Sequence, residues 1–351
     1  MNRRMKRRLI LHLGLWKTGT KTIQTFLRGN PEALAEEGIY YPKVFPDNPD
    51  HPITKASQHT ALLRDEVHHR ALAHELKGRP RKPDVDPSRT PLWSTAFRRF
   101  AESGADTAIV SWEDFSARPE AYPFDILKPR LATYNVLGVI YLRHQEDWAV
   151  SLYAHMVRGG LTDLSFDDFI RSITDRIAYS RLLDRIIATI PMDRLVVGDF
   201  NKATASGLLE DFFDKAELPR GPLAAADREA AKNRSPPYWV LLFLIRCRQA
   251  AISEADFELV RGALTGQGVR TIGPMLRPGL DLASPTQRQS LRDAATTDAE
   301  RLFERYAIRL SASSREPVDW RPFDAEDFIT IRDAIASRIS PSARDALRDA
   351  C

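Results

Sequence analysis

Four runs of apolar residues along the chain predict buried strands. They lie at residues 9–14, 107–111, 136–142 and 195–200. Short apolar runs without alternation are typical of strands that are covered on both faces, as in parallel sheets. We therefore expect these segments to lie side by side in one sheet.

Helical periodicity occupies the stretches between and after these runs. Behind the first run, apolar residues recur at helical spacing at Ile23, Phe26, Leu27 and Leu34. Further helices are predicted at residues 92–103, 146–156, 165–188 and 207–216. Ser165 and Asp168 resemble a capping box, which would open the helix at 165–188.

Strands that alternate with helices predict an α/β fold, in which helices flank a mostly parallel sheet with right-handed crossovers. We assign residues 1–220 to this core. Residues 42–91 are rich in proline and read as an inserted loop region with one helix near 58–75, of the kind that shapes a ligand cleft. Residues 221–351 predict a helical annex packed on the core, with helices at 237–251, 285–306 and 325–339.

Composition and charge narrow the class of protein. Among 351 residues, 51 Lys and Arg against 47 Asp and Glu give a net charge of +4, which is too small an excess to indicate nucleic-acid binding. Two cysteines, Cys247 and Cys351, are too few for a disulfide framework or a metal site and favour a reducing compartment. No segment reaches the roughly 18 apolar residues of a membrane span. The run at 9–15 is short and interrupted by His12, unlike a leader peptide. We expect a cytoplasmic protein; nothing in the sequence indicates its oligomeric state.

One segment, which joins the first strand to the first helix, carries a specific chemical signal. Residues 14–22 read Gly-Leu-Trp-Lys-Thr-Gly-Thr-Lys-Thr. A glycine-containing turn before a helix presents backbone amides and the positive end of the helix dipole to an anion. The residues expected to contact a phosphate-type ligand there are Lys17, Thr18, Gly19, Thr20, Lys21 and Thr22.

The register of this turn differs from that of nucleotide-hydrolysing P-loops. Those loops place a lysine and then a serine or threonine directly after the second glycine. Here Thr20 stands between Gly19 and Lys21, and a further lysine, Lys17, precedes that glycine. Asp199, at the end of the last apolar run, could be offered as a metal ligand of the P-loop type, but a carboxylate at a strand end is common.

The segment resembles the 5′-phosphosulfate loop of sulfotransferases that use 3′-phosphoadenosine 5′-phosphosulfate (PAPS). Bacterial members commonly read His-Ile-Gly-Leu-Pro-Lys-Thr-Gly-Thr-Thr-Ser-Ile-Gln, and residues 12–24 read His-Leu-Gly-Leu-Trp-Lys-Thr-Gly-Thr-Lys-Thr-Ile-Gln. The chain departs at Trp16, where proline is usual, and at Lys21, where threonine is usual. The resemblance implies the P-loop-like sulfotransferase fold, PAPS as co-substrate without a metal, and a leaving phosphate stabilised by Lys17 with Thr20 and Thr22.

The same resemblance covers about residues 9–240 and implies a second half of the PAPS site. Arg143, at the end of the third run, and Ser151, on the following helix, match the family's 3′-phosphate segment. An arginine can pair with a phosphate through two charge-assisted hydrogen bonds. A weaker match, Asn233-Arg234-Ser235, would place Arg234 over the same phosphate.

Transfer of a sulfuryl group needs a base for the acceptor proton, and the family uses either histidine or glutamate. His59, in the inserted region, is the first choice, because an ordinary imidazole titrates near neutral pH. Glu113 is the second choice, because it follows a strand end, where an open α/β sheet binds its ligands. Ser111 should face the same cleft; His144 and Glu146 are lesser candidates, and His12 reads as a core histidine.

Two other functions remain open at the level of sequence. The first is a P-loop kinase acting on a small molecule, since its fold is similar. The second is a catalytically degenerate protein that binds PAPS without turnover, because of Trp16 and Lys21. For a sulfotransferase, the acceptor could be the hydroxyl or amine of a glycan or another small metabolite, and the residues do not distinguish among these.

Overall fold

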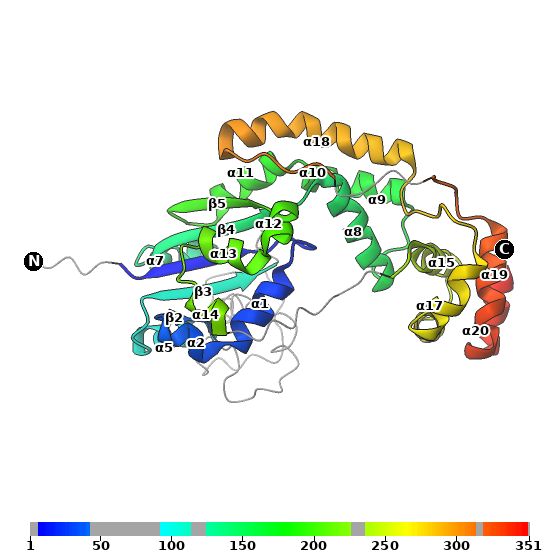
Figure 1. Cartoon of the computed structure of the whole chain (residues 1–351), viewed down its shortest axis with the longest axis horizontal. Helices are drawn as coiled ribbons and strands as arrows, with labels where there is room; N and C mark the ends of the chain where they lie inside the picture. Colours follow the sequence, from blue (N-terminus) through cyan, green and yellow to red (C-terminus); the bar gives the residue numbers. More distant parts are fainter. Residues whose placement is uncertain (1–5, 43–91, 114–123, 226–235, 314–318, 350–351) are drawn as a thin grey trace, which may run out of the picture. The chain divides into compact units, whose positions relative to one another are not determined.

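The structure, a computed structural model, describes residues 6–42, 92–113, 124–225, 236–313 and 319–349. It divides into two compact units, which are shown in Figure 1. The sheet unit comprises Met1–Arg143, Tyr179–Ala231 and Arg301–Ser311, and the helical unit comprises His144–Ala178, Lys232–Glu300 and Ala312–Cys351. Each unit is assembled from separate stretches of sequence. The division at residue 220 stays a prediction.

The sheet unit is built on a five-stranded parallel sheet in the order β2-β3-β1-β4-β5. The strands are β1 Arg8–Leu13, β2 Ile39–Tyr40, β3 Thr107–Trp112, β4 Asn135–Leu142 and β5 Arg194–Asp199. The predicted α/β class and the predicted parallel sheet are confirmed. The four predicted strands agree with the observed ones to within one residue at each end. The two-residue edge strand β2 was not predicted, because it is too short to show a pattern.

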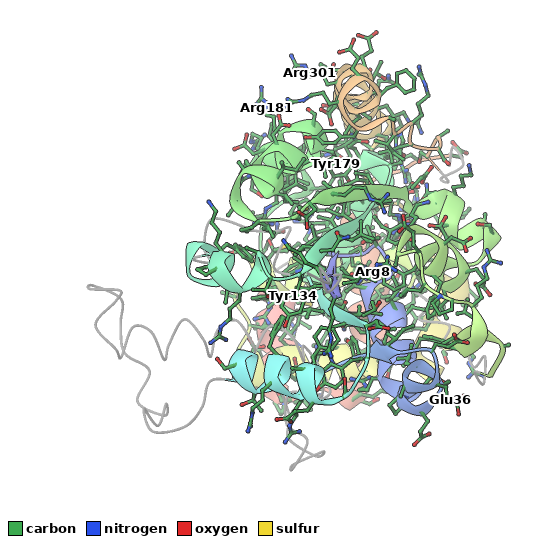
Figure 2. All side chains as sticks on the ribbon, turned by 90° about the vertical axis from the view of Figure 1, so that its left-hand side faces the viewer. Arg8, Glu36, Tyr134, Tyr179, Arg181 and Arg301 are labelled. Carbon is green, nitrogen blue, oxygen red and sulfur yellow. The ribbon has the colours of Figure 1, made fainter. Side chains whose placement is uncertain are left out.

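Helices of the sheet unit flank this sheet. They are α1 Thr20–Gly29, α2 Pro31–Glu36, α5 Leu92–Glu102, α7 Phe124–Leu131, α11 Tyr179–Thr189, α12 Phe200–Ser206, α13 Leu208–Lys215 and α14 Gly221–Ala225. On one face, Ile10 and Ile109 of the sheet pack with Ile23 of α1 and Phe212 of α13 in a single buried core. In Figure 2, Glu36 of α2 and Arg181 of α11 lie at opposite ends of this unit.

Helices alone form the second unit, apart from an isolated β-bridge within the described residues. They are α8 Gln145–Arg158, α9 Phe166–Ser172, α10 Thr174–Ile177, α15 Tyr238–Gln249, α16 Glu254–Ala263, α17 Gln267–Ile272, α19 Ala325–Ile335 and α20 Pro341–Asp349, with 3-10 turns at Gly273–Met275 and Ala336–Arg338. Helix α18, Pro285–Tyr306, begins in this unit and ends in the sheet unit. Among the described residues, no helix combines the length and the apolar character that crossing a membrane requires.

The prediction of a single helix at residues 165–188 is wrong, because the structure has three shorter helices there. Ser165 does cap a helix, since its hydroxyl accepts from the backbone amide of Asp168 at 3.1 Å. However, α9 ends at Ser172, and two further helices follow, because the backbone leaves helical geometry at Ile173 and again at Ala178. Side-chain bonds near the first break, from Ser172 and Thr174 hydroxyls to preceding carbonyls, compete with the helical pattern.

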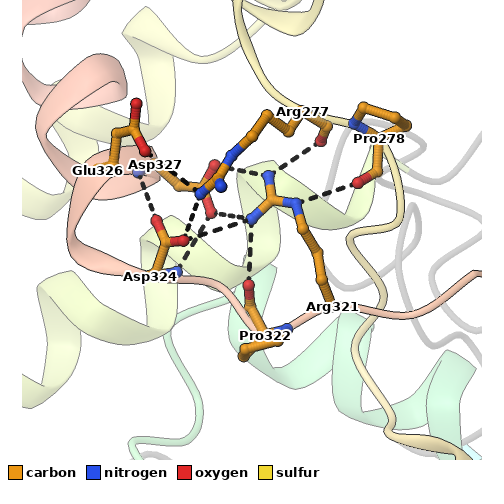
Figure 3. Close-up of polar contacts among 7 residues, drawn as sticks. All are labelled: Arg277, Pro278, Arg321, Pro322, Asp324, Glu326 and Asp327. Carbon is orange, nitrogen blue, oxygen red and sulfur yellow. Dashed lines mark hydrogen bonds and ion pairs between the residues drawn. The ribbon is translucent and has the colours of Figure 1, made fainter.

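Arg321 joins two segments of the helical unit (Figure 3). Its guanidinium donates to both carboxylate oxygens of Asp327 and to the carbonyl oxygens of Arg277 and Pro278. Asp327 also forms a capping box with Asp324, which Arg277 contacts in turn. These contacts fix the residue at which α19 begins.

Candidate active site

The candidate site lies where the sheet changes its winding direction. Strand β1 has β3 on one side and β4 on the other, so the chain leaves β1 toward one side of the sheet and later returns to the opposite side. Open α/β sheets bind ligands outside the carboxyl ends of the strands at such a point. The residues that follow these three strands are Gly14, Glu113 and Arg143.

The loop between β1 and α1 adopts a backbone suited to binding an anion. Lys17 and Gly19 have positive φ angles of 67° and 79°, and Gly19 stands at the N-cap of α1. Gly19 has no side chain with which to cap the helix, and its carbonyl accepts from the amides of Thr22 and Ile23 at 2.9 and 3.3 Å. The amides of α1 that precede Thr22 are the ones placed to bind an anion. The positive φ of Lys17 is unusual for a residue with a side chain and is typical of functional sites.

Two glycines let neighbouring residues approach the loop closely. A β-carbon on Gly14 would lie 2.6 Å from the Thr20 hydroxyl, and one on Gly19 would lie 2.4 Å from Leu208 Cδ2 and 2.9 Å from Phe200 Cε2. The loop is thus packed directly on α12 and α13. Gly19 is required both for its backbone angle and for this contact.

Replacing Gly19 by alanine is expected to lower the free energy of unfolding by about 2 kcal/mol, because strain at positive φ adds to a steric clash. Gly104 offers a matched control: its φ is 75°, and an added β-carbon would meet no described atom within 4 Å. Gly104→Ala should therefore show only the smaller backbone cost. Urea unfolding measures both, and equal losses would contradict the packing role of Gly19.

Threonine hydroxyls in the loop stabilise it from within. Thr18 Oγ1 donates to the Leu15 carbonyl at 2.6 Å and Thr20 Oγ1 reaches the same oxygen at 3.5 Å. Both threonines are buried, whereas Lys21 and Thr22 are exposed on the first turn of α1. The predicted roles of these four residues toward a ligand stay predictions.

Arg143 lies against the anion loop. Its guanidinium donates to the Lys17 carbonyl at 3.4 Å and lies over the Phe200 ring, 5.4 Å from the ring centroid. The backbone carbonyl of Arg143 accepts a hydrogen bond from the Tyr179 hydroxyl at 2.8 Å. Two cationic residues that are distant in sequence, Lys17 and Arg143, are therefore brought together at the carboxyl ends of β1 and β4.

The structure describes two of the four other predicted site residues, Glu113 and Ser151. Glu113 is partly exposed, and its backbone lies beside Gly14. Ser151 is partly exposed on α8 in the helical unit, so its position relative to the loop stays a prediction. His59 and Arg234 lie outside the described residues.

Asp199 caps a helix. One carboxylate oxygen accepts from the amides of Asn201 and Lys202 at 2.9 and 3.3 Å, and the other accepts from the amide and the hydroxyl of Ser311 at 2.6 and 2.5 Å. Both oxygens are therefore engaged in holding α12 and the segment after α18. Within the described part of the chain, no group of three or more His, Cys, Asp or Glu is arranged to hold a metal ion.

Glu146 is unsuited to act as the base. Its side chain is 0% exposed and forms ion pairs with Arg288 and Arg292 of α18. Burial raises the pKa of Glu146, but hydrogen bonds from Arg292 and Arg288 outweigh it, so the pKa is lowered overall. A carboxylate held ionised between two arginines is a weak proton acceptor. Its role is structural.

Ser111 and His12 form a contact that the sequence did not reveal. Ser111 was expected to face a cleft, but it is only 1% exposed, and its hydroxyl lies 2.7 Å from His12 Nδ1. That expectation is wrong, because the side chain points to the core face that α1 covers, where Gln24 meets it. His12 is buried, as predicted. A histidine within an otherwise apolar strand was the signal that could have suggested a polar partner.

No protein-family model matches the chain, and no curated protein matches it. Among solved structures, it is similar to a sulfotransferase from Alicyclobacillus acidocaldarius. The match covers 88% of this chain and 98% of that one, with 14% sequence identity and a TM-score of 0.43. A likeness at this level does not transfer an activity to the chain.

Proposed function

We propose that the protein transfers a sulfuryl group from PAPS to a hydroxyl or amine of an acceptor. One observation carries the proposal: the Arg143 guanidinium at the end of β4 contacts the backbone of Lys17 in the loop after β1. This contact joins the two segments that resemble the 5′-phosphosulfate and 3′-phosphate sites of PAPS-dependent sulfotransferases. PAPS carries anionic groups at both ends of its ribose and needs such a pair.

The charges around the loop support an anionic ligand. Lys17 lies within the loop and Lys21 in the first turn of α1, which holds no acidic residue. Arg143 contacts the Lys17 carbonyl. The positive end of the α1 dipole adds to this potential. A ligand with two phosphate-type groups would offset this positive charge.

The reaction follows from these groups. The acceptor oxygen or nitrogen attacks the sulfur, the bond between sulfur and the bridging phosphate oxygen breaks, and adenosine 3′,5′-bisphosphate leaves. Lys17 stabilises the charge that develops on the departing phosphate, as preorganised cations do in phosphoryl transfer. The acceptor proton passes to a base, for which His59 and Glu113 remain the candidates. The acceptor is a glycan or another small metabolite.

A small-molecule kinase is the weaker alternative. Its P-loop lysine would fall at Thr20, which is buried and turned toward Leu15, while Lys21 is exposed one residue later. Its strand-end metal ligand would be Asp199, whose two oxygens already accept hydrogen bonds from the protein. These observations favour a sulfuryl donor over a magnesium nucleotide.

Calorimetric titration with adenosine 3′,5′-bisphosphate, ADP and ATP with magnesium tests the proposal. We expect the bisphosphate to bind most tightly, and Arg143→Ala to weaken its binding about a hundredfold, because a desolvated bidentate pair is lost. The variant should change ADP binding much less, since ADP has no 3′-phosphate. Preference for ATP in the unmodified chain would instead favour the kinase.

Binding of the bisphosphate without turnover would point to the degenerate binding protein. That outcome is examined with radiolabelled PAPS and a panel of glycans, phenols, alcohols and amines. Transfer of label to any member of the panel establishes the enzyme, and its chemical class identifies the acceptor.

A further inference from the structure

Three polar side chains behind the anion loop form one hydrogen-bonded group. His12 Nδ1 of β1 lies 2.7 Å from Ser111 Oγ of β3. Gln24 Nε2 of α1 donates to that hydroxyl at 3.2 Å and to the Ser111 carbonyl at 3.3 Å. The group connects the ends of two neighbouring strands to the helix that begins at the loop.

His12 is costly to keep in this position. It is 0% exposed, and the rings of Phe212 and Tyr141 meet it edge-on with centroid distances of 5.2 and 6.5 Å. Its Nε2 has no hydrogen-bond partner among the described residues. A buried nitrogen without a partner destabilises a protein, whereas leucine would fill this strand position without that cost. The cost implies that the contact made by Nδ1 has a use.

A role in proton transfer does not account for it. Burial lowers the pKa of His12 to about 3, so the ring is neutral at physiological pH. Ser111 is also buried, so neither side chain is open to a substrate. What the pair can do is hold backbone in place.

The loop depends on the backbone that this group holds. The residue after Ser111, Trp112, accepts a hydrogen bond through its carbonyl from the Gly14 amide at 2.8 Å, which fixes where the loop begins. Gln24 lies little more than one turn beyond the start of α1, so its bonds to Ser111 fix the helix end that faces the ligand. Displacement of either contact would move the loop amides.

We propose that His12 is a positioning residue of the anion site, which acts through Ser111 and Gln24 to hold the loop and the first turns of α1 in their binding geometry. The nature of the anion rests on the proposed function, whereas the positioning itself does not.

Hydrogen exchange of the chain without added ligand tests the positioning directly. In His12→Leu, amides of residues 14–24 should exchange about five- to tenfold faster, because the hydrogen bond that holds Ser111 in place is lost. His12→Asn should restore slow exchange, since its side-chain amide can take the place of Nδ1, as a donor through Nδ2 or as an acceptor through Oδ1. Amides of β5, at the far edge of the sheet, are the internal reference and should change little. Titration with adenosine 3′,5′-bisphosphate should show a similar loss of affinity in His12→Leu and its recovery in His12→Asn.

A merely structural role predicts different results. The proposal would be overturned if exchange in His12→Leu accelerated equally in β5 and in residues 14–24. It would also be overturned if His12→Asn behaved like His12→Leu. If His12→Leu fails to fold, Ser111→Ala removes the same bond to His12, and Gln24→Leu removes the bonds that link Ser111 to α1. Unchanged loop exchange in both variants would overturn the proposal as well. Absence of bisphosphate binding in the unmodified chain would refute the proposed function and leave the exchange measurements to decide this inference.

Discussion

Replacement of Lys17 by alanine is expected to lower the rate constant of sulfuryl transfer about a hundred- to a thousandfold, because a preorganised cation is lost where negative charge develops on the leaving phosphate. Lys17 lies at the centre of the loop, and its carbonyl is held by Arg143. Folding should be nearly unaffected, since the side chain is only partly buried and alanine adopts the same backbone angle at a similar cost. Single-turnover transfer with saturating PAPS measures the rate.

Lys21 supplies the matched control for this prediction. It carries the same charge four residues later, but its side chain is exposed on the first turn of α1. Lys21→Ala should weaken PAPS binding by no more than about tenfold, since the charge acts through solvent, and should leave the single-turnover rate nearly unchanged. If the two variants exchange these effects, Lys21 is the residue at the leaving group, and the match of Lys17 to the phosphosulfate loop is wrong.

The fold could be predicted from the sequence because its signals are local. An apolar run such as that of β1, with a glycine at its end, specifies a buried strand and a turn without reference to the rest of the chain. The hydrophobic pattern does not reveal β2, which has two residues. It also predicts one helix where three lie between Ser165 and Thr189, because neither the side-chain bonds at Ser172 and Thr174 nor the departure from helical geometry at Ala178 leaves a trace in it.

The site was predictable only in part, because its contacts join distant residues. The loop at 14–22 was evident from its composition, and the resemblance to sulfotransferases indicated Arg143. The contact between Arg143 and Lys17 spans 126 positions and that between His12 and Ser111 spans 99, so neither can be derived from spacing. Asp199 illustrates the converse, since a strand-end carboxylate with the pattern of a metal ligand is a helix cap.

Arg288→Leu is expected to lower the stability of the helical unit by about 3–5 kcal/mol, the usual cost of removing one partner from a buried ion pair. The Arg288 guanidinium donates to Glu146 of α8 and to Asp281, whose side chains are 0% and 2% exposed. Leucine would leave both carboxylates buried. Glu146 would keep its ion pair with Arg292, whereas Asp281 would lose its ion pair with Arg288. The hydrophobic gain at position 288 is smaller than the cost of these charges. Urea unfolding at neutral pH measures the loss.

Arg292→Leu separates burial from charge in this cluster. Arg292 binds the same carboxylate from one turn further along α18, but its side chain is 41% exposed, so its removal should cost about 1 kcal/mol.

The pH dependence of the free energy of unfolding is a second, independent test of the role of Arg288. Because the pKa of Glu146 lies below its ordinary value of 4.5 in the folded chain, this carboxylate stabilises the fold above that pH, and the contribution is lost as pH falls through the lowered value. The difference in stability between the unmodified chain and Arg288→Leu should therefore shrink in acid. A difference that stays constant from pH 7 to about pH 3 would mean that packing, and not the ion pair, accounts for the effect of Arg288.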